Sequence, residues 1–131
     1  MTHVSPKNRK SDQLQTALEQ FVKRTPEVII AITATRDGLS VAAVKRGLIA
    51  TEEDALAVAA SDILDMAAQV NKQLEQGDIG RILIEGALRT TIVIGAGRYL
   101  ALIVVVPANA KLGIAMLSIR NMAQQIAKVY G

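Results

Sequence analysis

The chain has 131 residues and a formal net charge of +3, which suits one domain that buries a hydrophobic core without covalent staples. It contains no cysteine, which excludes disulfides, thiolate nucleophiles and cysteine-ligated metals, and its single histidine, His3, lies near the N-terminus. No stretch approaches the roughly 20 apolar residues of a membrane span, and the first residues lack the apolar core of a secretory signal, so we expect a cytoplasmic protein without a membrane span.

Residues 1–10 are predicted to form a disordered basic tail. Lys7, Arg9 and Lys10 precede the first acid, Asp12, whereas the rest of the chain carries twelve basic and twelve acidic residues. The basic character is therefore a property of the tail. A nucleic-acid interface would need a basic patch on the folded surface, usually with aromatic side chains for stacking, and the chain has one Phe and two Tyr. We expect no nucleic-acid partner.

The domain itself is predicted to span residues 11–131. Its first element is a helix that starts at Asp12, with Ser11 as its cap and Pro26 at its end. Apolar residues recur along this helix at helical spacing and form one narrow stripe, which predicts that one side packs on a core.

Two apolar, β-branched runs follow the first helix. They flank Asp37-Gly38, a dipeptide typical of hairpin turns. We therefore predict strands at about residues 27–34 and 39–46. Thr51 then caps a long helix over residues 52–76 that has acids in its first turn.

Gly77 can close this long helix, and three more apolar runs follow it. They predict strands at about residues 79–85, 88–94 and 98–106, joined by connections short enough for hairpins. A last helix is expected over about residues 110–129. The resulting order, α-β-β-α-β-β-β-α, places the chain in the α/β (α+β) class.

The strand sequences indicate which strands lie in the centre of the sheet. An antiparallel sheet that is open to water on one side alternates apolar with polar residues. The runs "VIIAI" and "LALIVVV" do not alternate, so both strands are expected to be central, with helices above and below. Residues 79–85 alternate in part and carry Arg81 and Glu85 on the face of Leu83, which indicates an edge strand.

The helix over residues 52–76 has more apolar surface than docking on one sheet requires. A seam with 4-3-4-3-4 spacing is expected to face the sheet, and it consists of Leu56, Ala60, Ile63, Ala67, Val70 and Leu74. Flanking residues such as Ala59 and Met66 widen the apolar arc to roughly 200°, twice the ~100° stripe of an ordinary surface helix. A second copy of the same helix, related by a two-fold axis, would cover the surplus. The alternative is a helix sunk in a groove of its own chain, with alanines that serve helix propensity.

The last helix shows a weaker form of the same pattern. Ile114 and Leu117 fall on the side opposite its core stripe. They are a possible partner surface, or they contact the first helix. Single exposed apolar residues are also ordinary.

Residues for catalysis or cofactor binding are missing from the sequence patterns. The acids at 52–54 suit a helix N-terminus, and Asp62 and Asp65 lie on the solvated strip of the long helix. No phosphate-binding P-loop motif occurs, and Gly95-Ala96-Gly97 precedes a strand where a dinucleotide site needs a helix. We therefore expect no enzyme activity, no cofactor and no metal site.

Two stretches carry a resemblance to a known family. The hairpin "TRDGLSVAAV" and the helix entry "PANAKLGIAMLSIR", together with the element order, resemble the roadblock/dynein light-chain family over about residues 11–129. The resemblance implies a five-stranded antiparallel sheet with one long helix on one face and two helices on the other, a profilin-like arrangement. Gly113 within the last helix costs about 1 kcal/mol against Ala, so we expect close packing there.

The resemblance also implies a function. Family members are non-catalytic platforms, and the chain is similar to the bacterial or archaeal members that act as the GTPase-activating partner of a Ras-like motility GTPase. Two subunits commonly join through the long helix and the strand after it. The expected homodimer interface comprises Ala59, Ile63, Met66, Ala67, Val70, Ile79, Arg81 and Leu83.

We therefore predict a homodimeric interaction module that binds and regulates or scaffolds a small Ras-like GTPase. Arg36 and Arg98 fit ordinary turn ends, and neither is expected to be an arginine finger. The alternatives are a ligand-sensing domain, which would need a pocket with convergent polar groups, a purely structural scaffold in a signalling complex, and an enzyme of unrecognised type.

Overall fold

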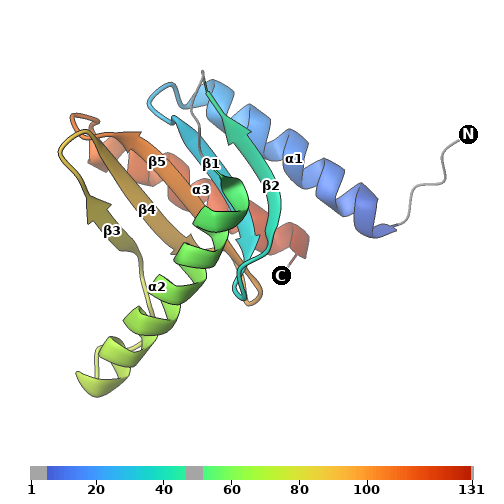
Figure 1. Ribbon diagram of the computed structural model, residues 1–131. Coiled ribbons are helices and arrows are strands. Elements are labelled where there is room, and N and C mark those ends of the chain that lie inside the picture. The colour runs from blue at the N-terminus through green and yellow to red at the C-terminus, as the bar shows by residue number, and fades with distance from the viewer. Residues whose placement is uncertain (1–5, 47–51, 131) are drawn as a thin grey trace, which may run out of the picture.

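The computed structural model describes residues 6–46 and 52–130 of the chain. These residues form three helices and five strands in the predicted order (Figure 1). The elements are α1 (Pro6–Arg24), β1 (Ile30–Thr35), β2 (Ser40–Lys45), α2 (Glu53–Gln73), β3 (Ile82–Glu85), β4 (Arg89–Gly95), β5 (Leu100–Pro107) and α3 (Leu112–Tyr130).

The five strands form one antiparallel sheet in the order β2-β1-β5-β4-β3. Strand β5 lies at the centre between β1 and β4, with Ile103 opposite both Ile32 and Val93. The predicted central position of the two non-alternating strands is confirmed. So is the edge position of the strand that contains Leu83.

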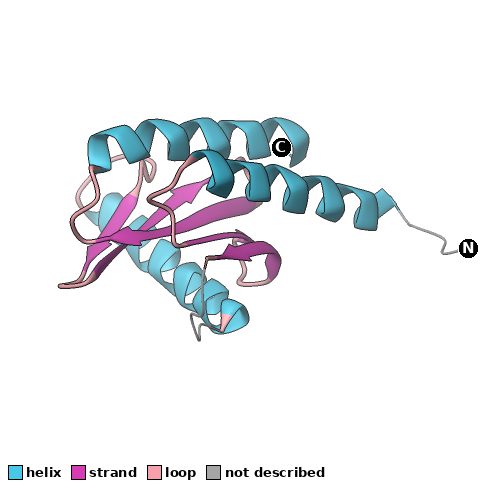
Figure 2. Cartoon of the chain, turned by 90° about the horizontal axis from the view of Figure 1, so that it is seen from above, coloured by secondary structure: helices cyan, strands magenta, loops and turns pink. Residues whose placement is uncertain are grey.

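Helices cover both faces of the sheet: α1 and α3 lie on one face and α2 on the other, as Figure 2 shows. Every residue of β5 from Leu100 to Val106 is buried, because alternate residues enter the two cores. The larger core packs Leu102 against side chains such as Phe21 of α1 and Ile119 of α3. Full burial of one such side chain contributes roughly 1.5–3 kcal/mol to the free energy of unfolding. Packing on both faces therefore stabilises the sheet between the helices.

Two helix ends differ from the predictions. Helix α1 begins at Pro6 instead of Asp12, so residues 6–10 of the predicted tail are helical, and residues 1–5 lie outside the described residues. Proline is well tolerated in the first turn of a helix because its missing N–H has no partner there. Thr51, the predicted cap of α2, lies outside the described residues, and Glu52 occupies the N-cap position without a side-chain hydrogen bond.

The end of α2 and the start of β3 also differ from the predictions. Helix α2 ends at Gln73 instead of residue 76, and β3 begins at Ile82 instead of residue 79. The chain turns between them with positive φ at Glu75 (55°) and Gly77 (85°). This longer connection leaves β3 with four residues.

Candidate functional site

Helix α2 docks on the sheet through Ala57, Ala60 and Leu64, its three buried residues. They pack with Ile103 of β5 in the smaller core. The predicted docking seam is therefore wrong in part, since two of its members, Val70 and Leu74, are exposed. An apolar arc of about 200° shows that a helix has two apolar sides but not which of them faces the sheet.

The surplus apolar surface of α2 lies exposed beside the docking face. Ala59, Ile63, Met66 and Val70 follow one another at helical spacing and form what we call the outer stripe. Met66 is 66% exposed and Val70 is 44% exposed, while Ile63 is half-buried. The prediction that α2 carries more apolar surface than its own sheet covers is confirmed by these exposures.

The edge of the sheet at β3 is open. Strand β3 pairs with β4 alone, and within the described residues no group bonds to its outer side. Leu83 is half-buried and Ile84 is 43% exposed. Two residues of the predicted interface, Ile79 and Arg81, precede the strand instead of lying in it, and Arg81 is exposed.

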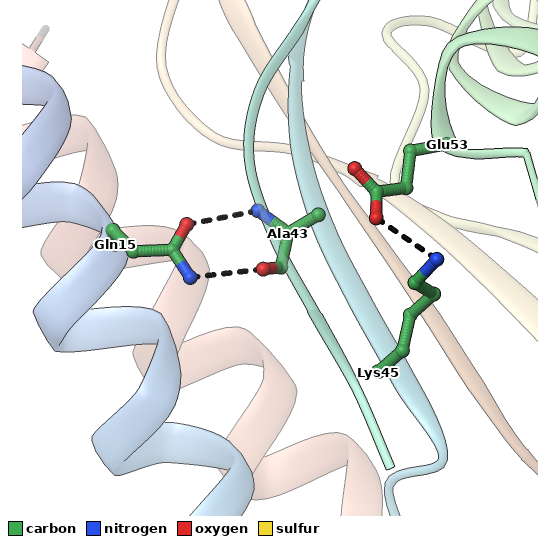
Figure 3. A network of polar contacts seen from close by, with 4 residues as sticks. All are labelled: Gln15, Ala43, Lys45 and Glu53. Atoms are coloured by element: carbon green, nitrogen blue, oxygen red, sulfur yellow. Dashed lines mark hydrogen bonds and ion pairs between the residues drawn. The ribbon is translucent and has the colours of Figure 1, made fainter. Parts of the chain in front are cut away.

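The opposite edge, at β2, is closed by α1 (Figure 3). The side-chain amide of Gln15 donates to the carbonyl oxygen of Ala43 at 2.9 Å and accepts the N–H of the same residue at 3.1 Å. Both outward backbone groups of Ala43 are thus satisfied by one side chain. An ion pair between Lys45 Nζ and Glu53 Oε1 at 3.1 Å links this edge to α2.

The tips of the two long hairpins are tied together by Arg36. Its Nη2 donates to the carbonyl oxygen of Gly97 at 2.9 Å, and its own carbonyl accepts the Ser61 hydroxyl at 2.7 Å. A Cβ on Gly95 would lie 2.5 Å from Arg36 Nη2, so glycine at this position makes room for the guanidinium. Arg36 therefore has a local structural partner in Gly97.

A hollow of about 780 Å³ lies between the C-terminal half of α2 and these hairpin tips. Its lining includes three basic and two acidic residues, which are Arg36, Lys72, Arg98, Glu75 and Asp78. This hollow is where a ligand-sensing domain would hold its ligand.

Helix α3 exposes Ile114 and Leu117, at 65% and 66%. Of the two sequence hypotheses for this pair, contact with α1 is therefore wrong. The predicted close packing at Gly113 is also absent among the described residues, because a Cβ there would meet no atom within 4 Å. This side of α3 is open.

Side-chain clusters for chemistry are likewise absent from the part of the chain that the structure describes. Residues 6–46 and 52–130 contain no group of three or more His, Cys, Asp or Glu side chains arranged to hold a metal ion. Among the described helices, none combines the length and apolar character needed to cross a membrane. The outer stripe and the open β3 edge are the main candidate functional site, because they combine exposed apolar side chains with unpaired strand groups.

The comparisons with known proteins agree with this arrangement. The model of the Roadblock/LC7 domain matches residues 14–106. A solved structure described as MglB with tetrameric arrangement has a TM-score of 0.82 at 18% identity, covering 98% of this chain and 93% of that chain. MglB of Myxococcus xanthus has a TM-score of 0.85 at 12% identity, with 99% and 94% covered.

Profilin IA of Acanthamoeba castellanii shares the fold more distantly, with a TM-score of 0.61 at 15% identity over 87% of this chain and 96% of that chain. At these identities the structural likeness establishes the fold. Among curated protein sequences, none matches this chain significantly.

Proposed function

Because the chain belongs to the Roadblock/LC7 domain family, we propose that it is a non-catalytic, homodimeric interaction module that binds and regulates or scaffolds a small Ras-like GTPase. The observation that carries the proposal is the outer stripe of α2, which leaves Met66 66% exposed beside an open sheet edge. Such a surface has no use in catalysis and is typical of a protein contact.

The homodimer places two copies of α2 side by side and pairs β3 with its counterpart. The outer stripe contributes Ala59, Ile63, Met66 and Val70, and the small side chains of Ala59 and the neighbouring Ala67 let the two helix backbones approach closely. An isologous contact of this kind is self-complementary, and two-fold dimers are the commonest soluble oligomers. The tetrameric arrangement named for one solved MglB is compatible with association of this fold.

Pairing of β3 with β3 joins two five-stranded sheets into one of ten strands. The outward N–H and C=O groups of β3 then gain partners, which removes an edge that would otherwise attract unrelated strands. Arg81 and Leu83 lie at this junction, with Ile79 just before it. In this dimer the α2 helices lie on one face of the joined sheet.

The proposed module acts on a GTPase without supplying a catalytic residue. The tie between Arg36 and Gly97 supports this view for Arg36, because an inserted arginine finger needs a free guanidinium. For Arg98 the view rests on its place at a turn end. Reshaping of the switch region of the GTPase, or tethering of the GTPase in a complex, remains as the mode of action. We place this function in the cytoplasm, where Ras-like GTPases act.

The dimer is tested by the mass of the full chain in solution. Sedimentation equilibrium between about 1 and 100 µM should give twice the 14.0 kDa of one chain at the upper concentrations. A mass of one chain throughout this range would contradict the homodimer.

The partner is tested separately by capture. Small Ras-like GTPases of the source organism, loaded with GDP or with a non-hydrolysable GTP analogue, are passed over the immobilised chain. We expect one of them to bind with a preference for one nucleotide state. Binding of none in either state would favour the structural scaffold, and a small molecule that raises the melting temperature through the hollow at α2 would favour a ligand-sensing domain.

A further inference from the structure

The helices α2 and α3 carry opposite charge. Residues 52–78, which include α2, contain seven acids and one lysine. Glu85 is the last acid in the chain, and residues 86–131, which include α3, contain five basic residues and no acid. Since α2 and α3 lie on opposite faces (Figure 2), an acidic segment is repelled by the side chains of α2 and attracted by those of α3, where Arg120 and Lys128 have no acid beside them in the helix.

A hollow of about 230 Å³ lies on the basic face, between α3 and β3. Its floor is apolar and is formed by Leu83, Gly113, Met116 and Leu117, and Arg81 and Arg120 also line it. No acidic residue lines this hollow. We call it the α3–β3 hollow.

The two arginines of the α3–β3 hollow are available to a partner. Arg81 and Arg120 are both exposed, and within residues 6–46 and 52–130 neither forms a hydrogen bond or an ion pair. Arginine binds carboxylates through two parallel N–H donors, so two free guanidinium groups beside an apolar floor match a segment with acids on each side of an apolar residue.

Gly113 indicates the shape of that segment. A glycine inside a helix costs about 1 kcal/mol relative to alanine, and at Gly113 no packing within the described chain offsets the cost, since a Cβ would meet open space. The missing side chain lets a second helix approach the backbone of α3 closely, within the usual 8–10 Å between axes or less. The neighbouring Ile114 and Leu117, both about two-thirds exposed, extend the apolar contact along the same helix.

We propose that the α3–β3 hollow binds an α-helical segment of a partner protein that presents an apolar side chain between carboxylates. The segment packs its apolar residue over Leu83 and Met116, crosses α3 at Gly113 and pairs its acids with Arg81 and Arg120. This surface lies on the other side of the sheet from α2 and adjoins the proposed β3 junction, with which it shares Arg81 and Leu83. It extends the proposed function by a second contact, centred on α3.

The test uses the full chain labelled with ¹⁵N and two synthetic helical peptides of 15 residues. One peptide carries Leu at positions i, i+4 and i+7 with flanking Glu, and the other replaces each Glu by Lys. We expect the Glu peptide to bind about tenfold more tightly and to shift the amide signals of Gly113, Leu117 and Arg120. The affinity of the Glu peptide should fall as the salt concentration rises. All of these measurements use the unmodified chain and therefore do not depend on the folding of a variant.

Variants then locate the contact. The change Arg120→Glu, which leaves Arg81 at the proposed β3 junction untouched, should weaken the Glu peptide by about tenfold. Lys128→Glu makes the same charge change on α3 outside the hollow and should alter the affinity by less than about twofold. Gly113→Leu should weaken both peptides, because it fills the approach to the helix, and circular dichroism checks that each variant is folded.

Four results would overturn the proposal. The first is equal affinity for the two peptides, and the second is a set of shifted signals that maps to α2. The third is binding of vesicles rich in phosphatidylserine through the same two arginines without competition from the Glu peptide, which would make the face a membrane contact. A peptide of residues 52–76 of this chain that outcompetes the Glu peptide would also overturn it, in favour of a second copy.

Discussion

The two edge strands of the sheet, β2 and β3, differ in whether their outward backbone groups have partners. At β2, Gln15 occupies both outward backbone groups of Ala43, and the α1 helix lies along the strand. At β3, the outer groups have no partner among the described residues. Exposed strand edges invite pairing with other chains, and proteins commonly block those they do not use. The difference shows that α1 covers one edge and that the other is open among the described residues, as the proposed dimer requires.

The largest expected effect comes from a charge in the proposed dimer contact beside the open edge. Ala67 is half-buried next to the outer stripe, and Ala67→Glu would bury an unpaired carboxylate there. A cost of roughly 3 kcal/mol or more should raise the dimer dissociation constant at least a hundredfold in sedimentation equilibrium. Ala68→Glu is the matched control, because Ala68 is exposed and lines the hollow on the other side of α2. Equal dissociation of both variants would place the contact elsewhere.

A change in β3 itself tests the edge more directly. The N–H of Gly86 bonds to the carbonyl of Arg89, so in an antiparallel ladder the groups of Leu83 point outward. Leu83→Pro removes an outward N–H and spares the bonds to β4, and it should weaken the dimer by about tenfold. Leu83→Ala loses part of the side chain but keeps the N–H, and it should weaken the dimer clearly less. If both variants dimerise like the parent chain, β3 is not part of the interface.

Opening the closed edge should have the opposite consequence. Gln15→Ala exposes the N–H and C=O of Ala43 and removes two hydrogen bonds, which should lower the free energy of unfolding by about 1–2 kcal/mol. It should also permit species larger than a dimer as concentration rises, because β2 becomes a second adhesive strand. Urea unfolding and light scattering measure the two effects. Gln13→Ala removes an exposed glutamine from the same helix and should change neither.

The smallest effect is expected at the ion pair beside the closed edge. The side chains of Lys45 and Glu53 are 32% and 38% exposed, so solvent screens their attraction. Glu53→Gln should lower the free energy of unfolding by less than about 1 kcal/mol, and the loss should shrink as salt is added. A loss of several kcal/mol would show that the pair, and not Gln15, holds the β2 edge.

Much of the fold could be predicted from the sequence because the signals are local. Asp37-Gly38 marks the first hairpin, and the non-alternating run of β5 marks a central strand. The surplus apolar surface of α2 could also be predicted, because it depends only on which residues share a side of the helix. Its docking side was not, because Leu64 and Val70 are equally apolar and the sheet alone decides which of them is covered.

The closed edge could not be predicted at all. Gln15 is an ordinary polar residue within a helix, and its role depends on the placement of Ala43, 28 positions later in the chain. The tie from Arg36 to Gly97 is non-local for the same reason, with 61 positions between donor and acceptor. Gly95 gave no clue to this tie, because it was predicted to lie in the connection after residue 94, whereas in the structure β4 includes it and Arg36 approaches it.

The contact between Gln15 and Ala43 means that α1 covers the β2 edge as well as packing on the core. A cleaved or shortened form of the protein that lacks α1 loses the helix that covers the β2 edge. It also exposes core side chains that pack with Phe21 of α1, such as Leu102. Both edges of its sheet would then be open, so that molecules could pair through β2 as well as through the proposed β3 contact and form open-ended filaments. The first helix would thereby limit the proposed assembly to two subunits.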